Sequence, residues 1–309
     1  MNFRKKYNSA LYWMLIPMLV ASCNNTIIIN PEFSNRVVVD AFFASGDSIG
    51  LNLFKNLSLA DSLQSSSDYF FEEGLDNAFV RLYDNDILTD TLKQGKYACE
   101  YQSDIVAKEG HEYKIIVTRD GYPEAEAVSS IPVFVPVDTI RYILSADSIN
   151  MKLNIEFSDK AETENYYVVR FYTLQNGFKK NRGFYNIDPV FGSNLKFDFN
   201  ILGFESGLNE VFRAEISDDG YDGERITYQA LLPTRFSGVG AVNDIFPSDT
   251  IGIMLYSVNK ELYDYNRSIE IYEQAQNSGA QPTDIYTNVK NGVGLFTGYS
   301  LTKYEFQFD

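Results

Sequence analysis

Val37-Val38-Val39-Asp40-Ala41-Phe42-Phe43 is followed, after Gly46 and Asp47, by Ile49-Gly50-Leu51-Asn52-Leu53. The first run is rich in β-branched and aromatic residues, and in the second run apolar residues alternate with small or polar ones. Both patterns are typical of β-strands, and a Gly-Asp pair between them is typical of a turn. This stretch therefore predicts that the chain folds as a β-protein from its first structured residues onward.

Further short runs of the same kind follow, separated by turn residues. They are Ala78–Tyr83, Ile87–Leu92 and Glu112–Thr118. Residues 58–74 are polar and acidic, which is typical of an exposed loop. Short strands at this spacing predict an Ig-like or transthyretin-like sandwich over residues 36–131.

A proline-containing segment then separates two parts of the chain. Residues 132–136 read Pro-Val-Phe-Val-Pro, and two prolines at this spacing favour an extended strut outside a sheet centre. We therefore expect a second domain over residues 137–309.

The second part contains longer strand patterns and one helix pattern. The expected strands are Asp138–Leu144, Asn150–Phe157, Tyr166–Leu174, Leu195–Ile201, Glu210–Ser217, Arg225–Leu232 and a last strand ending near Phe308. A stripe of Val258, Leu262, Tyr265, Ile269 and Tyr272, at spacings of four and three, predicts an amphipathic helix over about residues 257–277. The fold class is thus mainly β, with a larger antiparallel β-sandwich or barrel-like domain carrying one helix. We expect that helix to pack on its own domain, although its stripe would also suit a partner helix.

The first 23 residues predict export and lipid anchoring. Arg4, Lys5 and Lys6 precede an apolar run from Leu11 to Val20, which is shorter than the roughly 20 residues needed to span a bilayer. Residues 1–22 therefore read as a signal peptide, and residues 23–35 as a tether.

The end of the leader resembles the lipobox of bacterial lipoproteins. The tetrapeptide Val20-Ala21-Ser22-Cys23 would supply the signal-peptidase recognition residues and a lipidated Cys23. Two or more acyl chains anchor a protein stably, so the lipid bilayer is an expected partner. An ordinary signal peptide with an accidental cysteine is the alternative.

Composition argues against several function classes. The chain has 42 acidic and 26 basic residues, a formal net charge of −16, and the leader contributes three of the basic residues. Such a surface does not match nucleic acid. Cys99 is the one other cysteine, so no internal disulfide framework is expected, and we interpret it as an apolar strand residue. The 22 tyrosines and 23 phenylalanines suit either β-structure or an aromatic binding platform.

Catalytic signatures are sparse. The single histidine, His111, argues against His-rich zinc sites and Ser-His-Asp triads, and its context indicates an exposed turn residue. The segment Gly203–Gly207 has the glycine spacing of a nucleophile elbow, but Glu205 stands where the serine is needed. We therefore expect a non-enzymatic protein with no cofactor and no catalytic metal. A pair of carboxylates facing one cleft would instead favour a glycan-directed hydrolase.

One acidic loop leaves two interpretations open. Residues 217–224 contain Asp218, Asp222 and Glu224, and oxygen-rich loops with glycines bind Ca²⁺. The loop departs from the EF-hand pattern, because Gln229 stands where the closing glutamate should be. Asp and Gly are also ordinary residues of a connecting turn, which is the interpretation we favour.

Taken together, these features resemble a family of Bacteroidota lipoproteins, domain-of-unknown-function family 4249. The residues that carry the resemblance are the lipobox, the Val37–Asp40 strand, Ala78–Leu82 with Gly95–Tyr97, the Ile131-Pro132 strut with Asp138–Ile140, and the late segment Tyr286–Tyr299. The late segment contains Asn291-Gly292-Val293-Gly294-Leu295-Phe296, where the family commonly has two adjacent glycines and this chain has Asn291 before Gly292. We expect this segment to close the second domain, with a ligand-contacting loop as the alternative.

The resemblance implies an outer-membrane lipoprotein associated with a TonB-dependent transporter, and it provides no catalytic residues to transfer. The expected function is thus a lipid-anchored, non-enzymatic binding or accessory component. The alternatives are an envelope hydrolase and a purely structural periplasm-facing lipoprotein. Acidic residues that often follow the acylated cysteine of surface-exposed relatives are absent after Cys23. The sequence therefore leaves open which face of the membrane the protein occupies.

Overall fold

The computed structural model describes residues 35–56, 74–146, 149–191, 210–234, 244–281 and 283–308. These residues belong to one compact unit, Asn35–Asp309. The leader, Cys23, nearly all of the tether, most of the 58–74 loop and the expected strand at 195–201 lie outside the described residues.

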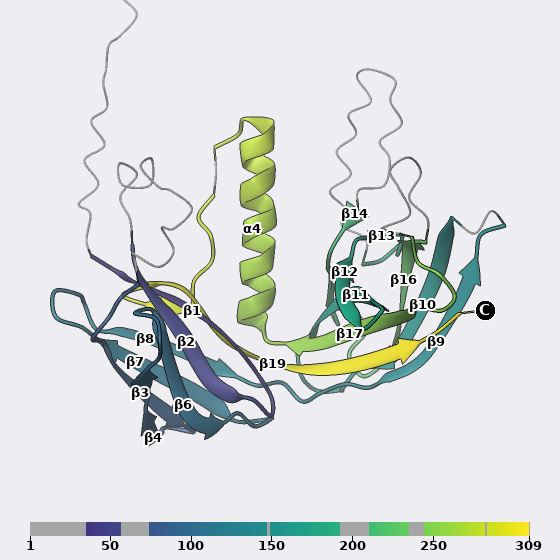
Figure 1. Ribbon diagram of the computed structural model, residues 1–309. Coiled ribbons are helices and arrows are strands. Elements are labelled where there is room, and N and C mark those ends of the chain that lie inside the picture. The colour runs from purple at the N-terminus through teal and green to yellow at the C-terminus, as the bar shows by residue number, and fades with distance from the viewer. Residues whose placement is uncertain are drawn as a thin grey trace, which may run out of the picture. The chain divides into compact units, whose positions relative to one another are not determined.

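The largest sheet has nine strands and contains both early and late parts of the chain (Figure 1). Its strands are, in spatial order, β12 (Phe178–Arg182), β11 (Tyr166–Gln175), β17 (Thr250–Val258), β19 (Val293–Phe306), β1 (Val37–Ala44), β2 (Ser48–Lys55), β6 (Glu100–Val106) and β5 (Lys93–Gln94), with β15 (Ala214–Ser217) paired to β11 outside this path.

Two five-stranded sheets complete the described structure. One runs in the order β14 (Glu210–Val211), β13 (Phe184–Asn186), β16 (Arg225–Pro233), β10 (Asn150–Ser158) and β9 (Val137–Leu144). The other runs β18 (Val289–Lys290), β8 (Ala125–Ser130), β7 (Glu112–Thr118), β3 (Phe79–Asp84) and β4 (Ile87–Thr91). Each sheet is open, with two end strands in the described residues, so the mainly β, sandwich-like prediction is confirmed.

Two hydrophobic cores lie between these sheets. The first contains Val39, Leu53, Leu82 and Ile115, and the second contains residues of β10, β11, β16 and β17. Burial follows the period of two expected for strands, as in β1, where alternate residues from Val37 to Phe43 are buried. Since each core buries one face of two sheets, each has the layering of a sandwich.

The late glycine segment corrects one prediction. Residues 293–299 pair in parallel with β1, and Phe296 is fully buried in the first core. The segment therefore closes the first sandwich, not the second. The remainder of β19 pairs with β17, so this one strand contributes to both parts of the chain. The two-domain division at residues 131–137 stays a prediction, and the shared strand is the feature that couples its halves.

The proline segment has no strand pairing of its own between Pro132 and Pro136. It is fastened to β19 by side chains: the Ser300 hydroxyl donates to the Pro132 carbonyl, and Thr302 Oγ1 donates to the Val135 carbonyl at 2.7 Å. The strut is thus held along the shared strand.

The single helix in the described residues, α4, spans Lys260–Ser278. It begins three residues later than expected, because Ser257 and Val258 complete β17. Asn259 is the N-cap and accepts a hydrogen bond from the Leu262 N–H, and Gly279 ends the helix in the left-handed conformation. Figure 1 shows the helix projecting from the nine-stranded sheet. None of the described helices is long and apolar enough to cross a membrane.

Candidate functional site

A cavity of about 380 Å³ lies where α4 meets the nine-stranded sheet. We call it the cradle. Its walls combine tyrosines and aliphatic residues with two arginines: Phe42, Val168, Arg170, Arg213, Tyr256, Val258, Leu262, Tyr265, Asn266, Ile269 and Tyr299. Cavities of this size and composition, apolar with a few polar groups, are typical of small-molecule sites.

Strand alternation places the sheet residues of the cradle on one face. Val168 and Arg170 lie two apart on β11, and in the pairing registers Val168 lies opposite Tyr256 while Tyr299 lies opposite Val258. Paired residues point to the same side of a sheet, so these side chains share the face on which α4 packs.

The helix supplies the other wall. Leu262 packs with Val168, Val258 and Leu295 in a third apolar cluster. The expected packing of the helix stripe within its own domain is therefore confirmed at Leu262, whereas Tyr265 and Ile269, farther along the helix, line the cradle.

The two arginines differ in their surroundings. The Arg170 guanidinium lies 5.7 Å from the ring centroid of Tyr256, in a cation–π arrangement. Arg213 Nε donates to Glu215 Oε1 at 3.0 Å. No ion pair joins Arg170 to a carboxylate in the parts of the chain that the structure describes.

The tyrosines of the cradle are neutral hydrogen-bonding groups. Burial raises the pKa of Tyr256, Tyr265 and Tyr299 above the ordinary value for tyrosine. The rings of Tyr256 and Tyr299 lie 5.5 Å apart, between their centroids. The Tyr265 and Tyr299 hydroxyls make no hydrogen bond to any described residue. They remain available to a ligand.

Glu215 borders the cradle, opposite Val168 in the β11–β15 register. Its side chain is 8% exposed, and burial, reinforced by the charge of Glu270, raises its pKa to about 7. Arg213 and Arg267 act in the opposite direction. Burial outweighs these ion pairs because a carboxylate loses much of its hydration energy in this position.

The acidic loop forms part of a carboxylate cluster. Asp159, Asp218 and Asp222 each place a carboxylate oxygen within 4.8 Å of the others. Asp218 and Asp222 were predicted, and Asp159 comes from the end of β10. Glu224 is not in the cluster. It meets Asp159 through its backbone carbonyl, which accepts from the Asp159 N–H at 2.9 Å.

The carboxylates of this cluster also bind the protein itself. Asp218 Oδ2 accepts from the Asn165 N–H at 2.9 Å, and Asp159 Oδ2 accepts from the Gly223 N–H at 2.8 Å. Burial raises the pKa of Asp218, and the charges of Asp159 and Asp222 add to the rise. These bonds fasten the loop to the neighbouring strands, as a connecting turn requires. The connecting turn stays the prediction, and calcium binding stays its untested alternative.

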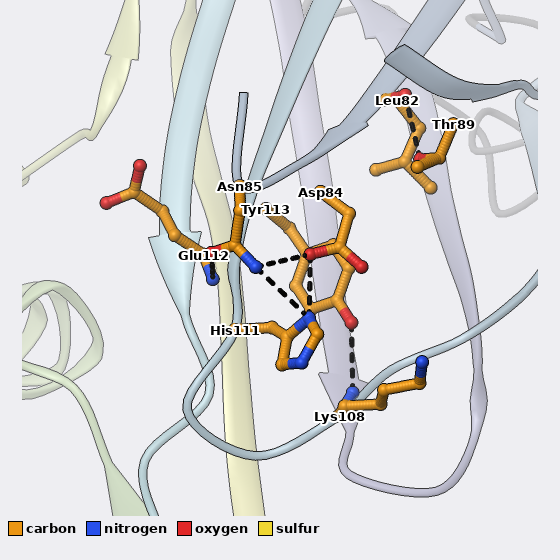
Figure 2. A network of polar contacts seen from close by, with 8 residues as sticks. All are labelled: Leu82, Asp84, Asn85, Thr89, Lys108, His111, Glu112 and Tyr113. Atoms are coloured by element: carbon orange, nitrogen blue, oxygen red, sulfur yellow. Dashed lines mark hydrogen bonds and ion pairs between the residues drawn. The ribbon is translucent and has the colours of Figure 1, made fainter. Parts of the chain in front are cut away.

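His111 is part of a structural network at the first sandwich (Figure 2). Its Nδ1 lies 2.7 Å from Asp84 Oδ1 and 3.3 Å from Asn85 Nδ2. The side chain is 33% exposed, so the prediction of an exposed turn histidine is corrected to a partly buried, paired one. Figure 2 also shows the Tyr113 hydroxyl accepting from the Lys108 N–H, at 3.0 Å. The network joins the β3–β4 turn to the start of β7.

Cys99 lies in the turn directly before β6, not in a strand as expected; it is buried, and burial raises the pKa of its thiol. This environment disfavours the reactive thiolate, in keeping with an apolar structural role. The lipidation residues Val20, Ala21, Ser22 and Cys23 and the elbow-like segment at 203–207 lie outside the described residues, so their predictions are untested by the structure.

Sequence reasoning did not single out the cradle. Its one local signal is Arg170, a charged residue within the apolar run Tyr166–Leu174. A charge in such a run is unfavourable unless it has a partner or a function. The convergence of β1, β11, β17, β19 and α4 on one cavity depends on pairings that no local pattern encodes.

Comparison with known proteins gives one family match. The model of a family described as domain of unknown function (DUF4249) matches residues 26–305. No curated protein matches the chain. Among solved structures, trypsin-activated alpha-2-macroglobulin from Escherichia coli aligns at 9% identity and a TM-score of 0.22 over 75% of this chain. This chain spans 15% of that protein's length, and at this TM-score the likeness carries no argument.

Proposed function

The chain belongs to the DUF4249 family, a domain of unknown function, and from that premise we propose that it is a lipid-anchored, non-enzymatic binding component of the bacterial outer membrane. The observation that carries the binding role is the cradle, a cavity with aromatic walls and an arginine that has no carboxylate partner in the described residues. The lipobox-like Val20–Cys23 supports the anchor.

Association with a TonB-dependent transporter is part of this proposal. It is supported by the resemblance of the lipobox and of the late segment Tyr286–Tyr299 to Bacteroidota lipoproteins. A binding protein held at the membrane raises the local concentration of its ligand near a transporter. A lipid tether would hold the protein at that place.

Purification of the full chain from gently solubilised membranes tests the proposal. We expect the wild-type chain in the membrane fraction together with a transporter. The Cys23→Ala variant, which lacks the acylated thiol, should leave that fraction because one anchor residue carries all the lipid. Recovery of the wild-type chain alone, or in the soluble fraction, would contradict the proposal.

Protease treatment of intact cells then distinguishes the two faces of the membrane. Cleavage within residues 58–74, the polar loop expected from the sequence, indicates the cell surface. Protection of the whole chain indicates the periplasm and favours the structural alternative.

A glycan-directed hydrolase is the second candidate, and one observation favours it. Glu215 has a pKa raised to about 7 and interacts with Glu270, and carboxyl groups with raised pKa are the acids of glycoside hydrolysis. Turnover of nitrophenyl glycosides that is lost in Glu215→Gln would establish this alternative. Equal rates for the two chains would remove it.

A further inference from the structure

Arg170 is the unusual charge of the cradle. The chain carries a net charge of −16, yet this guanidinium makes no ion pair with any carboxylate that the structure describes. It is partly buried, and its Cζ lies 5.7 Å from the ring centroid of Tyr256. Charges withdrawn from water are normally paired, so an arginine in this setting is suited to receive an anion from outside the chain.

Arg170 lines the cavity between β11 and the neighbouring strand β17. It lines the same cavity as Tyr256 and Tyr299, and its positive charge opposes the effect of burial on the pKa of both phenols. The guanidinium lies over the Tyr256 ring, and its planar group presents parallel N–H donors that suit a carboxylate.

The walls around Arg170 are largely aromatic and aliphatic, which suits an apolar ligand body. Tyr256 and Tyr299 form one wall with a ring separation of 5.5 Å, and Tyr265 and Ile269 of α4 line the same cavity. A volume of about 380 Å³ accommodates a small molecule. The hydroxyls of Tyr265 and Tyr299, which make no hydrogen bond to a described residue, can bond to such a ligand.

Nearby carboxylates limit the ligand to a low charge. Asp40, two residues before the lining residue Phe42 on β1, and Asp47 act electrostatically on Tyr265 and Tyr299 respectively. These acidic groups would repel a polyanion, whereas one anionic group can be satisfied by Arg170.

We propose that the cradle binds a small molecule with an apolar body and a single anionic group, and that Arg170 holds that group. This inference rests on the proposed binding function and specifies the chemistry of its ligand. The aromatic walls provide contact area, and the guanidinium provides the selectivity for charge.

Two probes that differ in charge but share one ring system test the inference. Binding of 2-naphthoate and 2-naphthamide to the full chain in neutral detergent is measured by calorimetry, with the heat of the detergent alone subtracted. We expect 2-naphthoate to bind at least about tenfold more tightly, since its carboxylate makes charge-assisted hydrogen bonds. In Arg170→Gln this preference should disappear, while binding of 2-naphthamide stays unchanged.

The control is Arg225→Gln, which removes an arginine outside the cradle and should preserve the preference. Far-ultraviolet circular dichroism establishes that each variant is folded. Equal binding of both probes to the wild-type chain, or a preference that survives in Arg170→Gln, would overturn the inferred ligand class and leave the binding function standing.

Failure of both probes to bind would also overturn the inference. If a transporter still co-purifies with the wild-type chain but not with Arg170→Gln, the cradle is a protein-docking site and the proposed function survives. If no partner co-purifies either, the inference and the proposed function fall together.

Discussion

Glu215 illustrates how burial can outweigh an ion pair at the scale of one residue. Its carboxylate accepts a hydrogen bond from Arg213, which by itself would favour the charged form. Burial and the charge of Glu270 nevertheless raise its pKa to about 7. The folded chain therefore holds a proton on Glu215 over a pH range in which the unfolded chain has released it.

This shift predicts a pH-dependent stability. Between about pH 4.5 and 7 the folded state binds more protons at Glu215, so its contribution to the free energy of unfolding falls as pH rises, by about 3 kcal/mol in total. Glu215→Gln should abolish this contribution and make the variant more stable than the wild type at pH 8 but not at pH 4. Urea denaturation at both pH values measures the difference.

The exposed residue Glu224, changed to Gln, is the control for the substitution itself. If the difference in unfolding free energy between the wild type and Glu215→Gln does not vary with pH, the raised pKa of Glu215 is contradicted. It would show that Glu215 keeps the same protonation in the folded and unfolded chains.

Individual site residues were only partly predictable. Asp218 and Asp222 stand four apart in one loop, and the structure brings them together as the sequence suggested. Asp159 joins them from another segment of the chain. Arg170 becomes a candidate ligand-binding residue only because β17, which carries Tyr256, lies beside β11. Local patterns do not encode such long-range neighbours.

At the scale of single elements, β19 and its contact with β1 decide how the chain closes. Gly294 has φ +103°, and a Cβ at this position would lie 2.0 Å from the Val39 carbonyl oxygen. Only glycine tolerates both the left-handed backbone and this close approach. The parallel pairing therefore depends on this residue.

Gly294→Ala should destabilise the protein by more than about 3 kcal/mol, because it combines backbone strain with a clash against β1. Gly46→Ala is a matched control. Gly46 has φ +89°, but nothing lies within 4 Å of its Cβ position, so we expect a loss of about 1 kcal/mol from the backbone alone. Chemical denaturation compares the two variants, and equal losses would contradict the close approach.

The start of α4 is held by a buried asparagine. Asn259 Oδ1 accepts from the Leu262 N–H at 3.1 Å and from Thr297 Oγ1 at 2.9 Å, and its Nδ2 donates to Ser129 Oγ at 2.6 Å. The residue thus joins the helix to β19 and β8. It fixes the helix over the cradle.

Asn259→Ala should cost about 3 kcal/mol of unfolding free energy, since it removes the cap and leaves buried partners unsatisfied. Asn259→Ser keeps a capping oxygen but does not reach Ser129, so its loss should be smaller. Thermal and urea unfolding measure both variants. A near-neutral Asn259→Ala would show that the helix is positioned by apolar packing alone.

Elements were more predictable than residues. The strand pattern at 112–118 matches β7, and the helix stripe predicted α4 to within three residues. The pattern did not predict β17, because its buried run Ile251–Val258 lacks alternation and leads directly into the helix. Strands buried on both faces lose the period of two that identifies them.

At the scale of the whole molecule, the shared strand predicts cooperative unfolding. β19 contributes Phe296 to the first core and pairs with β17 beside the second. If either sandwich unfolds, β19 loses its hydrogen-bonded neighbour there, and the other sandwich loses the support of an ordered β19. We expect hydrogen exchange of β7 and β16 to follow one common opening, and Phe296→Ala to accelerate both equally. Acceleration confined to β7 would indicate two independent units.

The central claim is that this family member is a membrane-tethered binding protein that recognises its ligand in the cradle. Its most direct test is a cryo-electron-microscopy structure of the complex purified from gently solubilised membranes. We expect a transporter beside the chain and compact non-protein density against Arg170 and Tyr256, between α4 and the nine-stranded sheet. A complex in which the cradle is empty, or is filled by a segment of another protein, would contradict it.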